Sequence, residues 1–239
     1  MHRLLLAGLV SAAVLASAVE ARYTTGSIAG RVTYLGRVPE PVYVFESGQA
    51  QSLISLDANK GVASAVVSLA SPELRPSADA ERDRTPEVTI NQRNWWFTPA
   101  IVVLRAGQPV RFTNDDPSNH SVRSTTGAPA NRFGAYTGTG EPYVHHFVAN
   151  RDGSPVVITC DIHAWMRAWV YVFDHPFYSM TDRTGRFSID ELAPGRYRLS
   201  ARHGPTGLAR DIDVAVTAGR ETPIDIVFDT NDLRLPDAF

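Results

Sequence analysis

Several residue types and patterns are scarce in this sequence, and each scarcity excludes a structural or functional class. Cys160 is the only cysteine among 239 residues, so no disulfide can form within the chain. Lysine occurs once, at Lys60, and arginine supplies the rest of the positive charge. The formal net charge is only −2, which predicts no strong electrostatic partner and no nucleic-acid binding. Apolar positions spaced as in an amphipathic helix are also scarce, which argues against an α-helical fold.

The N-terminus has the pattern of a secretory signal peptide. MHR is a short basic start, and LLLAGLVSAAVLASA is an apolar run of signal-peptide length. The small residues at 16–18 and 19–21 resemble cleavage sites. We therefore predict a signal peptide over residues 1–21 and a periplasmic or secreted protein. No later segment approaches the roughly 20 apolar residues of a spanning helix.

Short alternating apolar runs, interrupted by Gly, Pro, Asn and Asp, predict an all-β chain of sandwiches. In VRFTN, Val110 and Phe112 are expected to face inward. In VVITC, the same alternation places Cys160 on the inner face at a strand end. AWVYVF (168–173) is expected to resume a strand. Residues 71–86 are polar, charged and Pro-rich, which predicts a linker or exposed loop.

Four residues have the chemistry of a copper site. Cys160, His163 and Met166 stand three residues apart in CDIHAWM, and His120 lies forty residues upstream, just beyond a predicted strand. One thiolate, two imidazoles and a thioether form the ligand set of a trigonal copper site with a weak axial ligand. A buried, inert thiol is the alternative for Cys160, and the spacing of the other three residues counts against it.

Residues 86–173 resemble a cupredoxin, a small blue copper protein of the plastocyanin and amicyanin group. The resemblance rests on FTPAIVVLRAGQPVRFTNDDPSNHSV and VVITCDIHAWMRAWVYV, and the short Cys-x2-His-x2-Met loop is most similar to amicyanin. It implies a Greek-key β-sandwich in which His120, Cys160, His163 and Met166 bind one type 1 copper. One position departs from the pattern. Most relatives have Asn after the first histidine, where it ties the ligand loops together, and this chain has Ser121.

The flanking segments resemble a carboxypeptidase regulatory-like (transthyretin-like) β-sandwich. The residues concerned are TTGSIAGRVTYLGRVPEP, VASAVVSLAS and TDRTGRFSIDELAPGRYRLSARHG. In that module the second stretch normally leads directly to the third. The simplest interpretation is a discontinuous host domain, over 23–71 and 174–230, with the cupredoxin domain inserted in a loop. Two separate small domains are the alternative.

The remaining histidines are expected to play structural roles. His145 and His146 are adjacent in a predicted strand, so they point to opposite faces and cannot share one site. His175 is expected at a contact between domains, and His203 at a solvated strand end. The resemblance implies that His163 presents its ring edge to solvent as the electron port.

These features together predict an exported type 1 copper protein that carries single electrons between redox partner proteins and is not an enzyme. Three other classes stay open: a copper-delivery protein, an envelope binding module, and an enzyme of either of two types. A copper-delivery protein of the envelope would need an exchangeable site, and an envelope binding module would need no redox site. A copper nitrite reductase-like enzyme would need a second cupredoxin domain. A zinc hydrolase would need a general base beside an open metal position, and Asp161 is the only nearby carboxylate.

The signal-peptide hypothesis is tested by N-terminal sequencing. Protein recovered from the periplasm or medium is expected to begin between Val19 and Tyr23, because cleavage follows the small-residue sites. A full-length chain that starts at Met1 and accumulates in the cytoplasm would contradict export.

Overall fold

The computed structural model describes residues 24–70 and 86–235. The predicted signal peptide over 1–21 and almost all of the predicted linker over 71–86 lie outside these residues. Within them, strands dominate and the helices are short 3-10 turns, namely η1 (Pro129–Asn131), η2 (Gly204–Thr206) and η3 (Thr230–Asp232). The prediction of an all-β chain is confirmed. In the described parts no helix has the length and apolarity needed to cross a membrane.

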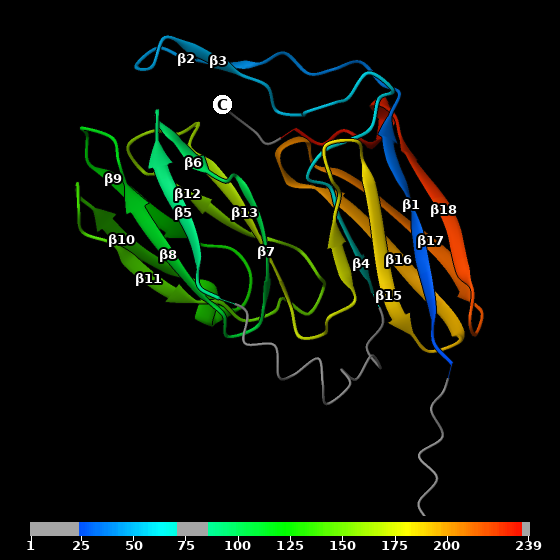
Figure 1. The fold of residues 1–239 in the computed structure, drawn as a ribbon. Coiled ribbons are helices and arrows are strands. Elements are labelled where there is room, and N and C mark those ends of the chain that lie inside the picture. The colour runs from blue at the N-terminus through cyan, green and yellow to red at the C-terminus, as the bar shows by residue number, and fades with distance from the viewer. Residues whose placement is uncertain (1–23, 71–85, 236–239) are drawn as a thin grey trace, which may run out of the picture.

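Strands from the two ends of the described chain build one sandwich. Its sheets have the orders β15-β1-β18 and β14-β4-β16-β17. The strands are β1 (Gly26–Tyr34), β4 (Val66–Leu69), β14 (Tyr178–Met180), β15 (Arg186–Leu192), β16 (Gly195–His203), β17 (Leu208–Val216) and β18 (Glu221–Phe228). Strands β1 and β4 precede the middle segment and the other five follow it. In Figure 1 they form the right half of the molecule.

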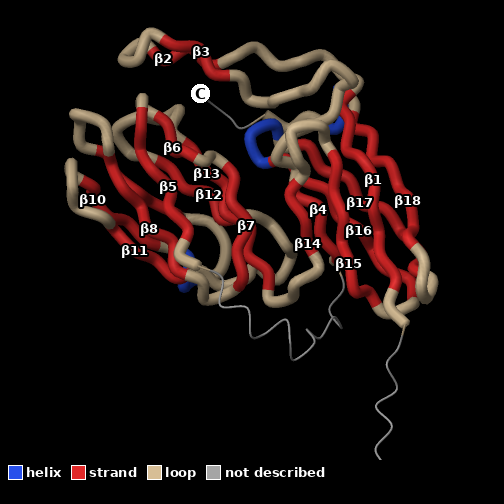
Figure 2. The backbone as a smooth tube through the Cα atoms, viewed as in Figure 1, coloured by secondary structure: helices blue, strands red, loops and turns tan. Residues whose placement is uncertain are grey.

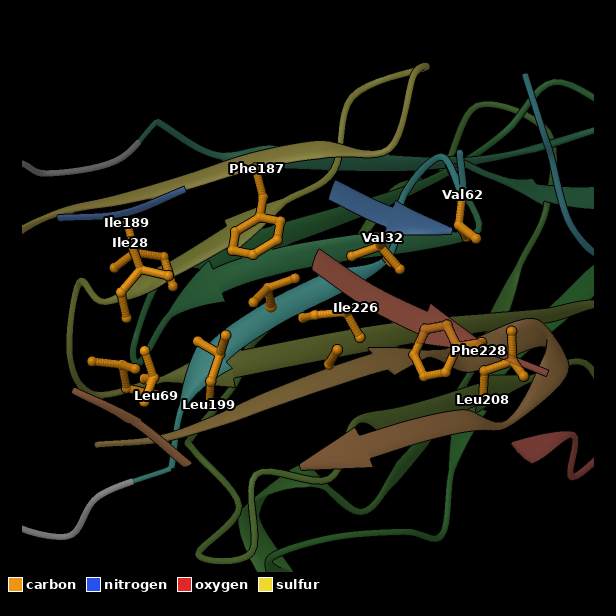
Figure 3. Close-up of a cluster of buried hydrophobic side chains, with 14 of the residues drawn as sticks. Ile28, Val32, Val62, Leu69, Phe187, Ile189, Leu199, Leu208, Ile226 and Phe228 are labelled. Atoms are coloured by element: carbon orange, nitrogen blue, oxygen red, sulfur yellow. The ribbon is translucent and has the colours of Figure 1, made fainter. Parts of the chain in front are cut away.

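A hydrophobic core fills the space between these two sheets (Figure 3). Strand β1 supplies Ile28, Val32 and Tyr34 to it, and all three are fully buried. Gly30 lies on the same strand, where a side chain would collide with the backbone of Ile224 on β18. The parallel pairing of β1 with β18 therefore depends on glycine at that position.

The middle segment forms two further sheets, shown in green in Figure 1 and as red strands in Figure 2. Their orders are β10-β9-β12-β13-β7 and β11-β8-β5-β6. The first contains β7 (Ile101–Arg105), β9 (His120–Ser124), β10 (Phe133–Thr137), β12 (Val156–Thr159) and β13 (Arg167–Phe173). The second contains β5 (Val88–Arg93), β6 (Trp96–Thr98), β8 (Pro109–Asn114) and β11 (Tyr143–His146).

The alternation expected from the sequence is present in this segment. Val110 and Phe112 of β8 are fully buried, as predicted. Val156 and Ile158 of β12 are buried on the same face as Cys160, which directly follows the strand. All five residues belong to one hydrophobic core, which extends to the end of the sandwich where the candidate ligands lie.

A third apolar cluster joins the two sandwiches. It contains Trp169, Tyr171 and Phe173 of β13 together with Val66 of β4. The intervening β13 residues, including Val170, face the core of the middle segment. Strand β13 is thus buried on both faces, which explains why AWVYVF reads as a continuous apolar run.

A separate hairpin extends from the end of β1. It pairs β2 (Val42–Val44) with β3 (Gln49–Gln51) and runs along the top of Figure 1. Tyr43 and Phe45 are 64% and 85% exposed. Val44 is the buried residue of these two strands, and most of the other side chains of the hairpin are exposed.

The structure corrects the expectation for His203. The residue was expected at a solvated strand end, but its side chain is buried. The following 3-10 turn η2 folds back over the end of β16, and His203 Nδ1 lies 2.7 Å from the Thr206 hydroxyl. His175 is also buried, and its ring packs against Phe173 and Phe177 between the two sandwiches.

The burial of His203 predicts acid sensitivity. Burial lowers the pKa of His203 to about 4, whereas an unfolded histidine titrates near 6.5. Between about pH 4 and pH 6.5, His203 is therefore protonated in the unfolded chain and neutral in the folded chain. Stability is therefore fully present above about pH 6.5 and is lost as the pH falls towards 4, by up to about 1.4 kcal/mol per pH unit.

Urea unfolding of the metal-free protein between pH 7 and pH 4.5 measures this loss. His203→Gln should make the pH dependence shallower, because no proton is then bound on unfolding at this position. An unchanged slope in His203→Gln would contradict the assignment.

Candidate metal centre

The strand order brings three candidate ligands to one end of the middle sandwich. His120 is the first residue of β9, and Cys160 directly follows β12. These strands are neighbours in the five-stranded sheet, where Thr159 is paired with Arg123. His163 lies in the loop that leads from β12 into β13. Within the described residues, His120, Cys160 and His163 are the one group of His, Cys, Asp and Glu side chains placed to hold a metal ion.

The three donor atoms form a compact triangle. His120 Nδ1 lies 3.0 Å from His163 Nδ1, and Cys160 Sγ lies 4.0 Å and 3.8 Å from these two nitrogens. A point equidistant from the three atoms is about 2.1 Å from each, close to the metal–nitrogen lengths of about 2.0–2.1 Å and metal–sulfur lengths of about 2.3 Å in protein sites. The triangle therefore has the size of a trigonal metal site.

The short distance between the two imidazole nitrogens also requires a hydrogen or a metal ion between them. Two bare nitrogen lone pairs at 3.0 Å repel each other, and both rings are buried, with exposures of 0% for His120 and 8% for His163. A proton or a metal cation relieves the repulsion. The donor set thus fits a metal ion in size, and a bound metal would replace the hydrogen between the two nitrogens.

Asp116 determines which nitrogen of His120 faces the other ligands. His120 Nε2 lies 2.9 Å from Asp116 Oδ2, and both side chains are buried. A carboxylate only accepts, so Nε2 carries the hydrogen and Nδ1 of the neutral ring keeps its lone pair for a metal. We did not expect Asp116 from the sequence; its only signal is a carboxylate four residues before His120.

The Asp116 carboxylate is itself fixed by the backbone of another loop. The N–H groups of Asn94 and Trp95 donate to its two oxygens, at 2.6 Å and 2.9 Å. Its own N–H donates to the Asn114 side chain, at 2.9 Å. These bonds hold the carboxylate in the orientation that His120 needs.

Ser121 ties the two ligand loops together. Its hydroxyl accepts the N–H of Asp161 at 2.7 Å, and its own N–H donates to Cys160 Sγ at 3.4 Å. The sequence did not decide whether Ser121 joins the two loops, because the resemblance implies a longer asparagine at this position. Serine makes the bond between the loops with its shorter side chain.

Cys160 is held in a field that favours the thiolate. Burial alone would raise its pKa, but the hydrogen bond with His120 and the N–H groups of Ser121, Ile162 and His163 lower it to about 6. Burial likewise opposes protonation of His120, yet its bonds to Cys160 and Asp116 raise the pKa above the usual value. A thiolate is the form of cysteine that binds metals.

Met166 closes the ligand loop and is fully buried. Its N–H donates to the His163 carbonyl at 3.0 Å, and its carbonyl accepts the N–H of Cys160 at 3.3 Å. Its side chain belongs to the same hydrophobic core as Cys160. The loop thus carries its fourth predicted ligand on the buried side, and the axial role of Met166 stays a prediction.

His163 lies nearer the surface than His120. Its ring packs against Trp165, with centroids 5.2 Å apart. Ile162 and Ala164 on either side of it are exposed, Ile162 by 51%.

The other histidines stay outside the site. His145 and His146 point to opposite faces of β11, as predicted. The His145 ring stacks on Phe133 with centroids 4.1 Å apart, and His146 is exposed with Nδ1 3.1 Å from the Gly107 carbonyl. Neither residue joins the group formed by the three candidate ligands.

Comparisons with known proteins give only distant structural likenesses. No family model matches the chain, and no curated protein sequence does so. The chain is similar to a copper-containing nitrite reductase from Thermus scotoductus, with 20% identity, a TM-score of 0.32, and coverage of 59% of this chain and 28% of that protein. It therefore spans little more than a quarter of the reductase.

Two smaller proteins are also similar. Amicyanin from Paracoccus versutus is 18% identical, with a TM-score of 0.31 and coverage of 45% of this chain and 97% of amicyanin. A purple cupredoxin from Nitrosopumilus maritimus is 21% identical, with a TM-score of 0.30 and coverage of 37% of this chain and all of that protein.

The site geometry predicts a thiolate in the metal-free protein at neutral pH. The ultraviolet absorbance of the Cys160 thiolate should titrate with a midpoint near 6, because the surrounding donors lower its pKa to about 6. His120→Phe removes the largest favourable contribution and should move the midpoint upward. Cys160→Ser should abolish the signal. A wild-type midpoint at the ordinary cysteine value of about 8.5 would contradict the hydrogen bonding described here.

Proposed function

We propose that this protein is an exported type 1 copper protein that carries single electrons between redox partner proteins. In this proposal His120, Cys160 and His163 form the trigonal plane of one copper site and Met166 is the axial ligand. The observation that carries it is the buried triangle of two imidazole nitrogens and one thiol sulfur, with edges of 3.0–4.0 Å. This donor set is the one that type 1 copper sites use.

The surroundings of the triangle suit electron transfer. When bound, copper supplies the one-electron couple between Cu(I) and Cu(II), whose preferred geometries differ. The chain opposes rearrangement, because Asp116 holds the ring of His120 and Ser121 joins the two ligand loops. A rigid ligand set keeps reorganisation small, and a weak thioether on the buried side tunes the potential.

The same burial disfavours two of the rival functions. A delivery protein exchanges its metal, whereas the three ligands here are at most 8% exposed and are fixed by hydrogen bonds. A hydrolytic metal site keeps an open position for water. In our proposal Met166, which is fully buried, occupies that side of the metal, so the protein performs no bond chemistry.

We further propose that the electron enters and leaves through His163. Its ring is closer to solvent than that of His120, and exposed apolar groups of Ile162 and Ala164 flank it. A small apolar contact suits a redox encounter, since the complex must dissociate after each transfer.

The domain organisation is also a proposal. We infer a cupredoxin domain over 86–173 inserted into a carboxypeptidase regulatory-like host over 23–71 and 174–230. The pairing of β4 with β14 and β16, across the whole middle segment, supports it. The host would provide a second surface for a partner in the envelope, in keeping with a periplasmic or secreted location.

The proposal is tested by loading the purified protein with Cu(II). We expect one copper per chain and an intense visible band from thiolate-to-copper charge transfer, which survives dialysis against a chelator. Cys160→Ser should lose the band because the thiolate is gone. Colourless wild-type protein after loading in oxidising buffer would refute the proposal.

A matched pair of variants distinguishes an axial-ligand role of Met166 from a structural role. Met166→Leu should keep copper and raise the reduction potential, because a weak axial donor is removed. Met180→Leu changes an exposed methionine of the other sandwich and should leave the potential unchanged. Loss of copper from Met166→Leu would instead assign Met166 a structural role.

A further inference from the structure

The turn between β5 and β6 has an unusual residue in a constrained position. Arg93 pairs with Trp96, so Asn94 and Trp95 form a two-residue hairpin loop. Both have positive φ, at 56° and 61°. Such loops favour Asn followed by Gly, since most side chains are strained in the left-handed region. A tryptophan in the glycine position requires compensation from its surroundings.

One side of this turn acts on His120. The N–H of Asn94 donates to Asp116 Oδ1 at 2.6 Å, and the N–H of Trp95 donates to Oδ2 at 2.9 Å. Oδ2 also receives the Nε2 hydrogen of His120, at 2.9 Å. The left-handed backbone points both N–H groups at one buried carboxylate, which in turn orients the imidazole.

The other side of the turn acts on His163. The carbonyl of Trp95 accepts the indole N–H of Trp165 at 3.1 Å. The Trp165 ring lies against the His163 ring, with centroids 5.2 Å apart and planes at 52°. The backbone of the Asn94–Trp95 turn thus bonds to one neighbour of each histidine, the Asp116 carboxylate and the Trp165 indole.

We propose that the Asn94–Trp95 turn is a shared positioning element that fixes the orientations of both histidines, through Asp116 for His120 and through Trp165 for His163. This role rests on the proposed copper function and adds to it a residue pair outside both ligand loops. The contacts come from backbone groups, so they depend on the left-handed conformation of the turn. The Trp95 ring contributes by packing against the core of the middle segment, which offsets the strain.

The first experiment removes one contact at a time in the copper-loaded protein. Trp165→Phe keeps an aromatic ring beside His163 but deletes the indole N–H, and Asp116→Asn removes the carboxylate charge at His120. Each should accelerate copper removal by a chelator roughly 10-fold and change the copper electron paramagnetic resonance spectrum, because ligand orientation is lost. Trp96→Phe changes the neighbouring tryptophan of the same hairpin and should match wild type in both readouts.

The second experiment uses the metal-free protein and tests the coupling itself. In Asp116→Asn one of the two oxygens that accept the N–H groups of the turn is replaced by an NH2 donor, which weakens the hold on the turn. The indole N–H of Trp165, which bonds to the other side of the turn, should then exchange with solvent faster, as measured by NMR. The indole N–H of Trp96 is the internal control.

The outcomes separate this inference from the proposed function. Colourless wild-type protein refutes the copper proposal, and exchange of the Trp165 indole still tests the turn. Blue wild-type protein with unaltered copper release and spectra in both Trp165→Phe and Asp116→Asn refutes the positioning role alone. Indole exchange that is unchanged in Asp116→Asn shows that the two histidines are supported independently, and it overturns the shared element.

Discussion

The hydrogen bond from His120 Nε2 to Asp116 is the interaction on which the candidate centre depends. It lies in the protein interior, where an unpaired carboxylate or imidazole would be costly. By keeping the hydrogen on Nε2, it leaves Nδ1 facing His163 and Cys160. The other contacts of the site, from Ser121 to the thiol and from Trp165 to His163, refine a geometry that this bond has already oriented.

The β-sandwich supplies the second constraint, since it fixes where the ligand loops begin. Neighbouring strands β9 and β12 deliver His120 and Cys160 to the same end of the sheet. Strand β13 then follows the ligand loop and packs on two cores at once, through Val170 on one face and Trp169 on the other. A shift of β13 would therefore disturb both the site and the contact between the sandwiches.

Much of this arrangement could be predicted from residue patterns, and the failures have physical causes. Period-two alternation placed Cys160 inside because strand geometry is local. Asp116 escaped notice because its role depends on a contact with His120 across a loop that has no periodicity. The Asn94–Trp95 turn lacks the Asn-Gly signature of its class. His203 was wrongly expected in solvent, because its burial depends on how η2 folds back, which is a tertiary effect.

The pairing of β4 with β14 has a consequence for the order of events during synthesis. The N–H of Leu69 donates to the carbonyl of Phe177, so the chain leaves one sandwich and returns to it at adjacent points. In the described part of the chain, the strands within residues 88–173 pair only with one another. Strand β1 pairs with β18, which is synthesised much later. Contacts between near segments form sooner than contacts between distant ones. The middle sandwich can thus fold during synthesis, before the strands that complete the flanking sandwich have been made.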